Sequence, residues 1–507
     1  MSADSPPCRR LGRNSRAILG TGFGCAAIVA LLIASPLASA TGNERSFVIH
    51  VGEGIDILGE RSPDWPVREP YIAVDPRNPA VLVAGAIDTS LAATGVGHVW
   101  DRYFRSADGG RSWSSFMIPG FPGDTSKQGR SSPLFGQNAS ADPMVAFDDQ
   151  GNLYYSGLAT SFPPGTTFAN WCGNGGSLSD VVFVAKFAED GARYVRTALA
   201  SNPATACADF PRLAVDASGG AHDGSVYVMF DNLSSGNAVG SFVRSTDGGR
   251  TFSSPTQFNG IFLWPAVDPR GNLYAVGWNA SVSGIVSFPV WKSVDGGQTF
   301  LAPVSAGTSL IGFAPLPSFA PNYFGGSNFE IAADCHGVYV VYPGFDESRG
   351  VWTLNFTRST DGGQTWSASE RLGEAPNANQ YEAALAVAGG IVSVAWYDSR
   401  NGQLPNGNVS RLDVYYVASF DNGRTFSNDV RVSARSWNPS TVYFDDSVYS
   451  ILPLQSAWFG EYFGLAASPD SVHVLWVSNQ DACEVTNATY GCVDQDVMTA
   501  TITFGDD

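Results

Sequence analysis

An eight-residue pattern recurs five times in this 507-residue chain and constrains its fold more than any other feature. The pattern reads Ser-x-Asp-x-Gly-x-x-aromatic, and its copies begin at Ser106, Ser245, Ser293, Ser359 and Ser419. The aspartate can accept hydrogen bonds from the amides of a tight turn, and glycine supplies a positive-φ position. The closing aromatic residue can pack between neighbouring sheets. The repeat therefore predicts a series of similar hairpin turns, one for each structural unit.

A second repeated element, a short strand followed by a turn and another strand, gives the number of units. Its seven copies begin near Glu69, Asp142, Phe210, Trp264, Phe329, Tyr381 and Glu461. The long interval between the first two boxes spans two units, and a degenerate box at 188–194 fills it. Seven units of about four strands predict an all-β fold, a single seven-bladed β-propeller over residues 44–507.

The two ends of the predicted propeller each contribute one strand. Residues 46–51 and 497–504 both have the pattern of a β-strand. We expect these two strands to pair in the last blade, because that would close the ring and protect two sheet edges.

The composition agrees with short strands and turns and excludes two classes of protein. Charged residues make up 15% of the chain and aromatic residues 12%, and there are 56 glycines. The formal net charge of −18 argues against a nucleic-acid partner, because phosphate backbones would be repelled. A hydrophobic content of 44% is enough for a large core and argues against disorder.

Residues 1–40 have the features of a secretory signal peptide. Four arginines between Arg9 and Arg16 precede an apolar run at 28–34, and Ala38-Ser39-Ala40 fits a cleavage site. We expect a secreted protein without a membrane span after cleavage; the alternative is an uncleaved membrane anchor. Export permits disulfides. The expected pairs are Cys483 with Cys492 and Cys172 with Cys207, whereas Cys335 is expected as a buried free thiol.

Acidic residues occur where the innermost strand of most blades begins. They are Glu69, Asp142, Asp209, Glu330, Glu382 and Glu461. We expect them to ring the mouth of the central channel, where crowded carboxylates bind a cation, raise one another's pKa, or hold neighbouring blades together by hydrogen bonds. If a divalent cation such as calcium binds, Glu69, Asp142 and Glu461 are its predicted ligands; no cofactor is required.

Loops on the same face carry aromatic, acidic and basic side chains that suit sugar recognition. The candidates are Trp100 and Asp101 in the first blade, and Tyr397, Asp398 and Arg400 in the sixth. Aromatic rings stack on sugar faces, and arginine forks bind acid groups. His98 is the one histidine that we place on this face, and it is a candidate general base. These residues predict an extracellular glycan as the partner.

The repeated box resembles the Asp box of the BNR-repeat, sialidase-like propeller families. Those families carry Arg-Ile-Pro on the first inner strand, where this chain has Arg68-Glu69-Pro70, and Tyr462-Phe463-Gly464-Leu465 resembles the context of their tyrosine nucleophile. The resemblance implies Tyr462 as nucleophile and Glu382 or Glu330 as its activating glutamate. It also implies Arg68 and Arg400 as ligands of a substrate carboxylate. Asp101 or Asp88 would be the acid/base residue.

The resemblance implies a secreted, monomeric exo-glycosidase of sialidase type that acts on acidic glycans. Two features depart from the family: seven blades where sialidases usually have six, and Glu69 in the place of isoleucine. Two other functions therefore stay open. One is a polysaccharide lyase in which His98 or a tyrosine removes the proton next to a uronate. The other is a non-catalytic extracellular propeller that binds a glycan or a protein.

Overall fold

The computed structural model describes thirteen stretches of the chain. They are residues 47–59, 67–93, 95–163, 180–201, 207–234, 238–281, 283–311, 328–403, 409–439, 460–479, 486–487, 491–492 and 495–506. The predicted signal peptide lies outside them, as do Cys172 and Cys483. Within these stretches, no helix has the length and apolar character needed to cross a bilayer.

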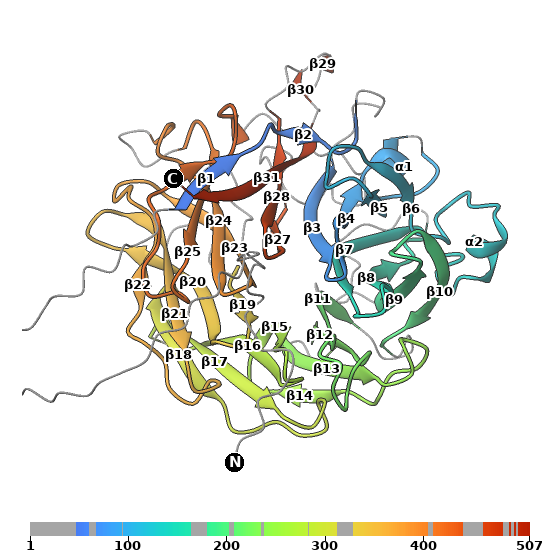
Figure 1. The fold of residues 1–507 in the computed structure, drawn as a ribbon. Coiled ribbons are helices and arrows are strands. Elements are labelled where there is room, and N and C mark those ends of the chain that lie inside the picture. Colours follow the sequence, from blue (N-terminus) through green and yellow to red (C-terminus); the bar gives the residue numbers. More distant parts are fainter. Residues whose placement is uncertain are drawn as a thin grey trace, which may run out of the picture.

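Seven antiparallel sheets stand around a central axis, which confirms the predicted seven-bladed β-propeller (Figure 1). The first three blades, in chain order, are β3 (Val67–Asp75), β4 (Asn78–Asp88), β5 (Trp100–Ser106) and β6 (Ser114–Met117); β7 (Ala139–Phe147), β8 (Leu153–Thr160), β9 (Asp180–Ala188) and β10 (Arg193–Leu199); and β11 (Ala208–Val215), β12 (Val226–Asn232), β13 (Val239–Ser245) and β14 (Thr256–Phe258). Two short helices, α1 (Ser90–Ala93) and α2 (Lys127–Ser131), lie in loops.

The next three blades repeat the same order of strands. They are β15 (Ile261–Val267), β16 (Leu273–Ala280), β17 (Ile285–Ser293) and β18 (Val304–Leu310); β19 (Glu330–Ala333), β20 (Val338–Asp346), β21 (Val351–Ser359) and β22 (Glu370–Arg371); and β23 (Gln380–Ala388), β24 (Ile391–Asp398), β25 (Asp413–Ser419) and β26 (Val430–Arg431).

The seventh blade joins the two ends of the chain, as predicted. Its strands from the axis outward are β27 (Gly464–Ala467), β28 (Ser471–Ser478), β31 (Asp496–Asp506) and β1 (Phe47–Val51), and β2 (Ile55–Asp56) also pairs with β31. Phe47 pairs with Asp506 and Val51 with Ile502. A separate two-stranded sheet contains β29 (Thr486–Asn487) and β30 (Gly491–Cys492). The N-terminal strand thus completes the outer edge of a blade that the C-terminal strands begin.

Each box forms the hairpin turn that its sequence predicts. In the box of blade 5, the Asp361 carboxylate accepts bonds from the amides of Gln364 (3.0 Å) and Thr365 (2.9 Å) and from the hydroxyls of Ser359 (2.8 Å) and Thr365 (2.6 Å). Two glycines of this turn, Gly362 and Gly363, have φ angles of 74° and 87°. These hydrogen bonds lower the pKa of Asp361 to about 2.

The degenerate box of blade 2 is shifted by one residue from its predicted alignment. In blade 1 the box serine Ser106 pairs with Leu82, whereas in blade 2 the residue that pairs with Leu153 is Phe187, not Ala188. Asp190 therefore takes the position of the first box glycine and adopts a φ angle of 53°. The shift arises because sequence matching favoured the Asp-Gly pair, while strand register determines the true position.

In blades 1, 3 and 5, the arginine directly before the box donates a hydrogen bond to a backbone carbonyl in the box of the following blade. Arg105 donates to the carbonyl of Asp190 at 2.8 Å, Arg244 to that of Gly296 at 2.9 Å, and Arg358 to that of Asn422 at 3.3 Å. The boxes therefore take part in blade-to-blade contacts on the face opposite the inner-strand starts.

Cys207 and Cys335 each take part in a disulfide bond. The expectation of a free thiol at Cys335 is therefore wrong. Cys335 lies in the turn between β19 and β20 and is only half-buried, so it is not the core residue that its apolar neighbours suggested.

Candidate functional site

The inner strands of five blades share a β-bulge at the point where the acidic residues occur. In each bulge the strand register shifts, and the first bulge residue has a positive φ angle although it is not glycine. These residues are Glu69 (54°), Asp142 (61°), Phe210 (50°), Phe262 (54°) and Glu382 (47°). A bulge turns a side chain away from its regular strand direction, and such a φ angle is held only by its surroundings. The Glu-Pro and Asp-Pro pairs of the sequence are therefore features of this repeated bulge.

Three buried or half-buried acids connect one blade to the inner strand of the next. Asp142 accepts a hydrogen bond from the amide of Phe210 at 3.2 Å, and Asp231 accepts one from the amide of Phe262 at 3.0 Å. Glu330 accepts one from the amide of Leu385 at 2.7 Å. Of the alternatives for the channel acids, blade-to-blade hydrogen bonding thus applies to Asp142 and Glu330.

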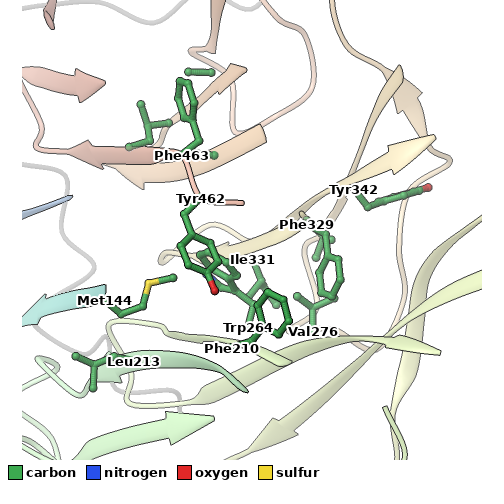
Figure 2. Close-up of a cluster of buried hydrophobic side chains, with 14 of the residues drawn as sticks. Met144, Phe210, Leu213, Trp264, Val276, Phe329, Ile331, Tyr342, Tyr462 and Phe463 are labelled. Atoms are coloured by element: carbon green, nitrogen blue, oxygen red, sulfur yellow. The ribbon is translucent and has the colours of Figure 1, made fainter. Parts of the chain in front are cut away.

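Aromatic side chains and one arginine meet near the axis and close the channel at this level. Figure 2 shows Tyr462 reaching toward Phe210 and Trp264 within a cluster of buried side chains. The guanidinium carbon of Arg212 lies 4.2 Å from the ring centroid of Tyr462 and 4.5 Å from that of Trp264. Tyr71 of the first blade lies 5.9 Å from Trp264 between ring centroids. The acids therefore lie around a channel that these aromatic and arginine side chains fill at this level.

A small pocket opens beside these side chains. Phe210, Arg212, Phe262, Trp264, Asn328 and Glu461 line it. Arg212 is 6% exposed, and its Nε has no hydrogen-bond partner. The pocket has room for about one ordered water molecule. It brings together an aromatic wall, a guanidinium and a carboxyl, which are groups that recognise acidic sugars, but a sugar ring would enter only if the side chains around the pocket moved apart.

Burial and crowding raise the pKa of the carboxyls around Arg212. Burial, followed by the charge of Asp142, raises the pKa of Glu461 to about 8. Burial also raises the pKa of Glu330 to about 8. Burial and then the Asp142 charge raise the pKa of Glu69 well above its usual range. Several of these acids are therefore protonated at neutral pH.

Five of the predicted site residues come together in this region. Burial raises the pKa of Tyr462, and Arg212, Asp142, Glu69 and Glu461 are the charged groups that act most strongly on it. Arg68 acts on both Glu69 and Glu461. The predicted nucleophile, one predicted arginine and the three predicted metal ligands (Tyr462, Arg68, Glu69, Asp142 and Glu461) are thus neighbours.

The predicted activating glutamate Glu382 lies elsewhere. It is 2% exposed, and its charge acts on Tyr397, whose pKa is raised first by burial and then by this glutamate. Tyr397 is itself buried: its hydroxyl accepts a hydrogen bond from the amide of Val477 at 2.8 Å, and its ring lies 4.9 Å from that of Phe463. The carboxylate next to Tyr462 is instead that of Asp142, whose charge raises the pKa of this tyrosine after burial.

The candidates of the first blade lie in its interior or away from the pocket. Trp100 is fully buried, and its indole donates to the carbonyl of Ile118 at 2.9 Å. Asp101 is also fully buried, next to Ser140 and Tyr155, and burial raises its pKa well above the usual range. The ring of His98 packs edge-on against Phe162, with ring centroids 5.6 Å apart.

The candidates of the sixth blade form an ion-pair cluster of their own. Arg400 donates to Asp398 at 2.8 Å and to Asp429 at 2.6 Å, and its guanidinium lies 3.6 Å from the ring centroid of Tyr415. Asp398 is fully buried and also accepts from the indole of Trp396 at 2.9 Å. Arg400 is thus bound to partners of its own blade and does not line the pocket.

The predicted calcium ligands Glu69, Asp142 and Glu461 lie close together. Among the residues that the structure describes, no group of three or more His, Cys, Asp or Glu side chains is arranged to hold a metal ion. Arg68 and Arg212 supply positive charge to these carboxyls. The two guanidinium groups therefore offset part of the negative charge of these carboxyls.

The main site residue that sequence reasoning missed is Arg212. It follows the bulge of the third inner strand, at the position that Tyr71, Met144 and Trp264 occupy in blades 1, 2 and 4. An arginine at a position that is otherwise apolar or aromatic was the signal in the repeat that could have revealed it.

Comparison with known proteins assigns the repeat. Residues 357–368 match the family model described as BNR/Asp-box repeat. No curated protein matches the chain.

Several solved structures resemble the chain at low identity. A protein of unknown function from Dyadobacter fermentans is 11% identical, with a TM-score of 0.48, and the match covers 90% of this chain and 99% of that one. A Hadza microbial sialidase is 12% identical (TM-score 0.42; 81% and 74% covered). An α-L-arabinofuranosidase from Fusarium graminearum is 14% identical (TM-score 0.35; 58% and 93% covered). With its seven sheets and its matched box, the chain is a β-propeller built from BNR/Asp-box repeats.

Proposed function

We propose that the protein is a secreted glycoside hydrolase of sialidase type, with its site at the pocket beside Tyr462. The observation that carries this proposal is the placement of Arg212, Glu461 and an aromatic wall around one pocket, with Tyr462 and Asp142 directly behind it. An arginine and aromatic rings suit an acidic sugar, and a tyrosine beside a carboxylate can act as a nucleophile.

Three side chains have the chemistry needed for cleavage with a covalent intermediate. Asp142 would take the hydroxyl proton of Tyr462 as the phenolic oxygen bonds to the anomeric carbon. The bond from that carbon to the leaving oxygen would break, and the protonated carboxyl of Glu461 would give its proton to the leaving oxygen. A carboxyl with a pKa of about 8 carries the required proton at neutral pH.

A glycan-binding function without cleavage is the second candidate, and one observation favours it. The side chain of Tyr462 is 1% exposed, so its hydroxyl does not face the pocket openly. A ligand held by Arg212, Trp264 and Glu461 would then be bound without contacting the nucleophile.

Purified protein and a panel of substrates distinguish these functions. We expect release of the fluorophore from a 4-methylumbelliferyl α-sialoside, with no release from neutral β-galactoside or α-L-arabinofuranoside probes. Tyr462→Phe should abolish the activity, whereas Tyr416→Phe should retain it, because that buried hydroxyl bonds only to Ser393 in blade 6. Glycan binding without turnover would support the binding function, and ultraviolet absorbance from an unsaturated uronate product would instead indicate a lyase.

The role of Glu461 can be read from the pH dependence of the same reaction. We expect kcat/KM to fall above pH about 8 as this acid loses its proton, and Glu461→Gln should remove that alkaline limb. Addition of calcium chloride or a chelator tests the remaining prediction of a cation at these carboxyls, since the proposed chemistry uses protein side chains alone.

A further inference from the structure

The segment between the first two blades, residues 118–138, forms a ledge at the periphery of the propeller. Its helix α2 lies at the edge of the ring, beyond β9 and β10 (Figure 1). Ile118 and Leu134 are fully buried in the hydrophobic cluster shared by blades 1 and 2. The ledge is therefore packed onto the propeller near both of its ends, and none of its residues lines the pocket beside Tyr462.

The carboxylate of Asp124 holds this ledge together from the inside. It accepts hydrogen bonds from the amides of Gly120 at 3.0 Å and Ser126 at 2.9 Å. Gly129 packs so closely against it that a Cβ atom there would overlap the carboxylate. The Ser126 hydroxyl accepts a hydrogen bond from the amide of Gly129 at 2.9 Å and caps α2. The only acid of residues 118–138 is thus 8% exposed and directed inward.

The side chains that the ledge presents to solvent are cationic, aromatic or uncharged. Lys127 and Arg130 are exposed and lie three residues apart on α2, which makes them neighbours on one helix face. Phe135 is 57% exposed, and a turn in which its amide donates to the carbonyl of Ser132 at 3.1 Å places it next to α2. The other exposed residues of the ledge carry no charge: Gly123, Thr125, Ser126, Gln128, Ser131, Pro133 and Gly136.

The two cations of the ledge are available to an anionic partner. Within the part of the chain that the structure describes, neither Lys127 nor Arg130 takes part in an ion pair. The nearby carboxylate of Asp124 already accepts two backbone amides. In a chain with a net charge of −18, the ledge therefore presents positive charge without an exposed acid of its own.

We propose that this ledge is an accessory binding site for an anionic glycan chain. The exposed ring of Phe135 would stack on the face of a sugar, and Lys127 and Arg130 would pair with carboxylate or sulfate groups of the chain. The amide of Gln128 can donate to sugar hydroxyls. The inference rests on the proposed function for one point, namely that the same class of acidic glycan is the substrate of the pocket.

Size and charge favour a glycan over the two other partners that bind basic surfaces. A stable protein interface takes about 20–30 residues from each side, whereas the ledge exposes ten: Lys127, Arg130, Phe135 and the seven uncharged residues. Duplex DNA carries one charge per about 1.7 Å of its axis, so the acidic remainder of the protein would repel it strongly. A glycan with one acid group on each sugar or disaccharide has a lower charge density and is repelled less.

Binding of the intact protein to immobilised glycans, measured by biolayer interferometry, tests the site without any need for cleavage. The probes are polysialic acid, polymannuronate and chondroitin sulfate, with dextran as a neutral glycan. We expect the protein to bind at least one acidic glycan and not dextran. This binding should weaken strongly in 1 M salt, where charges are screened beyond about 3 Å.

Substitutions on the ledge identify the residues that bind. Lys127→Ala combined with Arg130→Ala should weaken binding about tenfold, because two charge-assisted contacts are lost. Phe135→Ala should weaken it about fivefold through loss of ring stacking. The matched controls are Arg424→Ala, at an exposed arginine in the box of blade 6, and Leu301→Ala, at an apolar residue that is also 57% exposed. Both controls should bind as the wild type does.

Several outcomes would overturn the accessory site. They are binding to none of the three acidic glycans, equal binding to dextran, tighter binding to duplex DNA, and ledge variants that bind as tightly as the controls. A change of oligomeric state in the ledge variants would assign the surface to a second copy of the chain instead. Glycan binding through the ledge without cleavage of any glycan refutes the proposed function alone. Cleavage of the 4-methylumbelliferyl α-sialoside, with glycan binding that the ledge substitutions do not alter, refutes the accessory site alone.

Discussion

Gly460→Ala should destabilise the protein more than an alanine at any ordinary positive-φ glycine, because two separate costs add. The φ angle at Gly460 is 98°, a conformation that costs an L-residue about 1–2 kcal/mol. The new Cβ would also lie 2.3 Å from Cγ of Glu69, and overpacking of this kind costs about 1–3 kcal/mol. Together the two effects predict a loss of about 2–5 kcal/mol in the free energy of unfolding.

Gly350→Ala is the matched control for this substitution. Gly350 has a φ angle of 66°, and a Cβ atom there meets nothing within 4 Å. Only the conformational cost of about 1–2 kcal/mol applies. The difference between the two variants therefore measures the contact between Gly460 and Glu69.

Urea unfolding followed by tryptophan fluorescence gives both free energies. We expect Gly460→Ala to lower the midpoint clearly more than Gly350→Ala, and to reduce any glycosidase activity that Gly350→Ala retains. Equal midpoints for the two variants would show that the segment at Gly460 is free to shift away from Glu69. The close packing of Gly460 against Glu69 would then be refuted.

Two further predictions concern the boxes. Asp361→Ala removes the acceptor of four hydrogen bonds in an exposed turn, so we expect the free energy of unfolding, measured with urea, to fall by about 2 kcal/mol. Asp361→Asn keeps one acceptor oxygen and should lose about half as much. Equal losses for the two variants would contradict this bonding. Arg244→Met removes the blade-to-blade hydrogen bond to the Gly296 carbonyl and should lower the free energy of unfolding by about 1 kcal/mol. Arg250→Met, at an exposed arginine in the box of the same blade, should leave the stability unchanged. Equal effects of the two substitutions would show that the bond contributes nothing.

The fold could be predicted from the sequence because its determinants are local and repeated. Each box contains its own turn chemistry: Ser245 and Asp247 bond to one another and to amides within four residues. Five boxes together with seven copies of the strand–turn–strand element leave few possible architectures. Closure by the N-terminal strand was predictable too, because strands at the two ends of the chain each lacked a partner.

The site was only partly predictable, because its geometry depends on register between strands. An acid at an inner-strand start can be found in the sequence, but whether it points to the pocket depends on the bulge. Glu69 and Asp142 face each other because both occupy bulges, whereas Glu382, in the same bulge position of blade 6, lies by Tyr397. Arg212 was missed because its importance comes from the rings of blades 4 and 7 that enclose it.

The residue before each box shows how a repeat adapts where it ends. Blades 1, 3 and 5 have Arg105, Arg244 and Arg358 there, each bonded to the box of the following blade. Blade 6 has Ala418 at this position, and no copy of the box pattern follows in the sequence. An arginine at 418 would have no box carbonyl of that kind to bind, so the alanine is expected where the series of boxes stops.

In the seventh blade the N-terminal strand provides a different contact to blade 6. Phe47 of β1 stacks on Phe420 in the box of blade 6, with ring centroids 4.3 Å apart. An aromatic contact therefore joins blades 6 and 7, where the series of boxes stops.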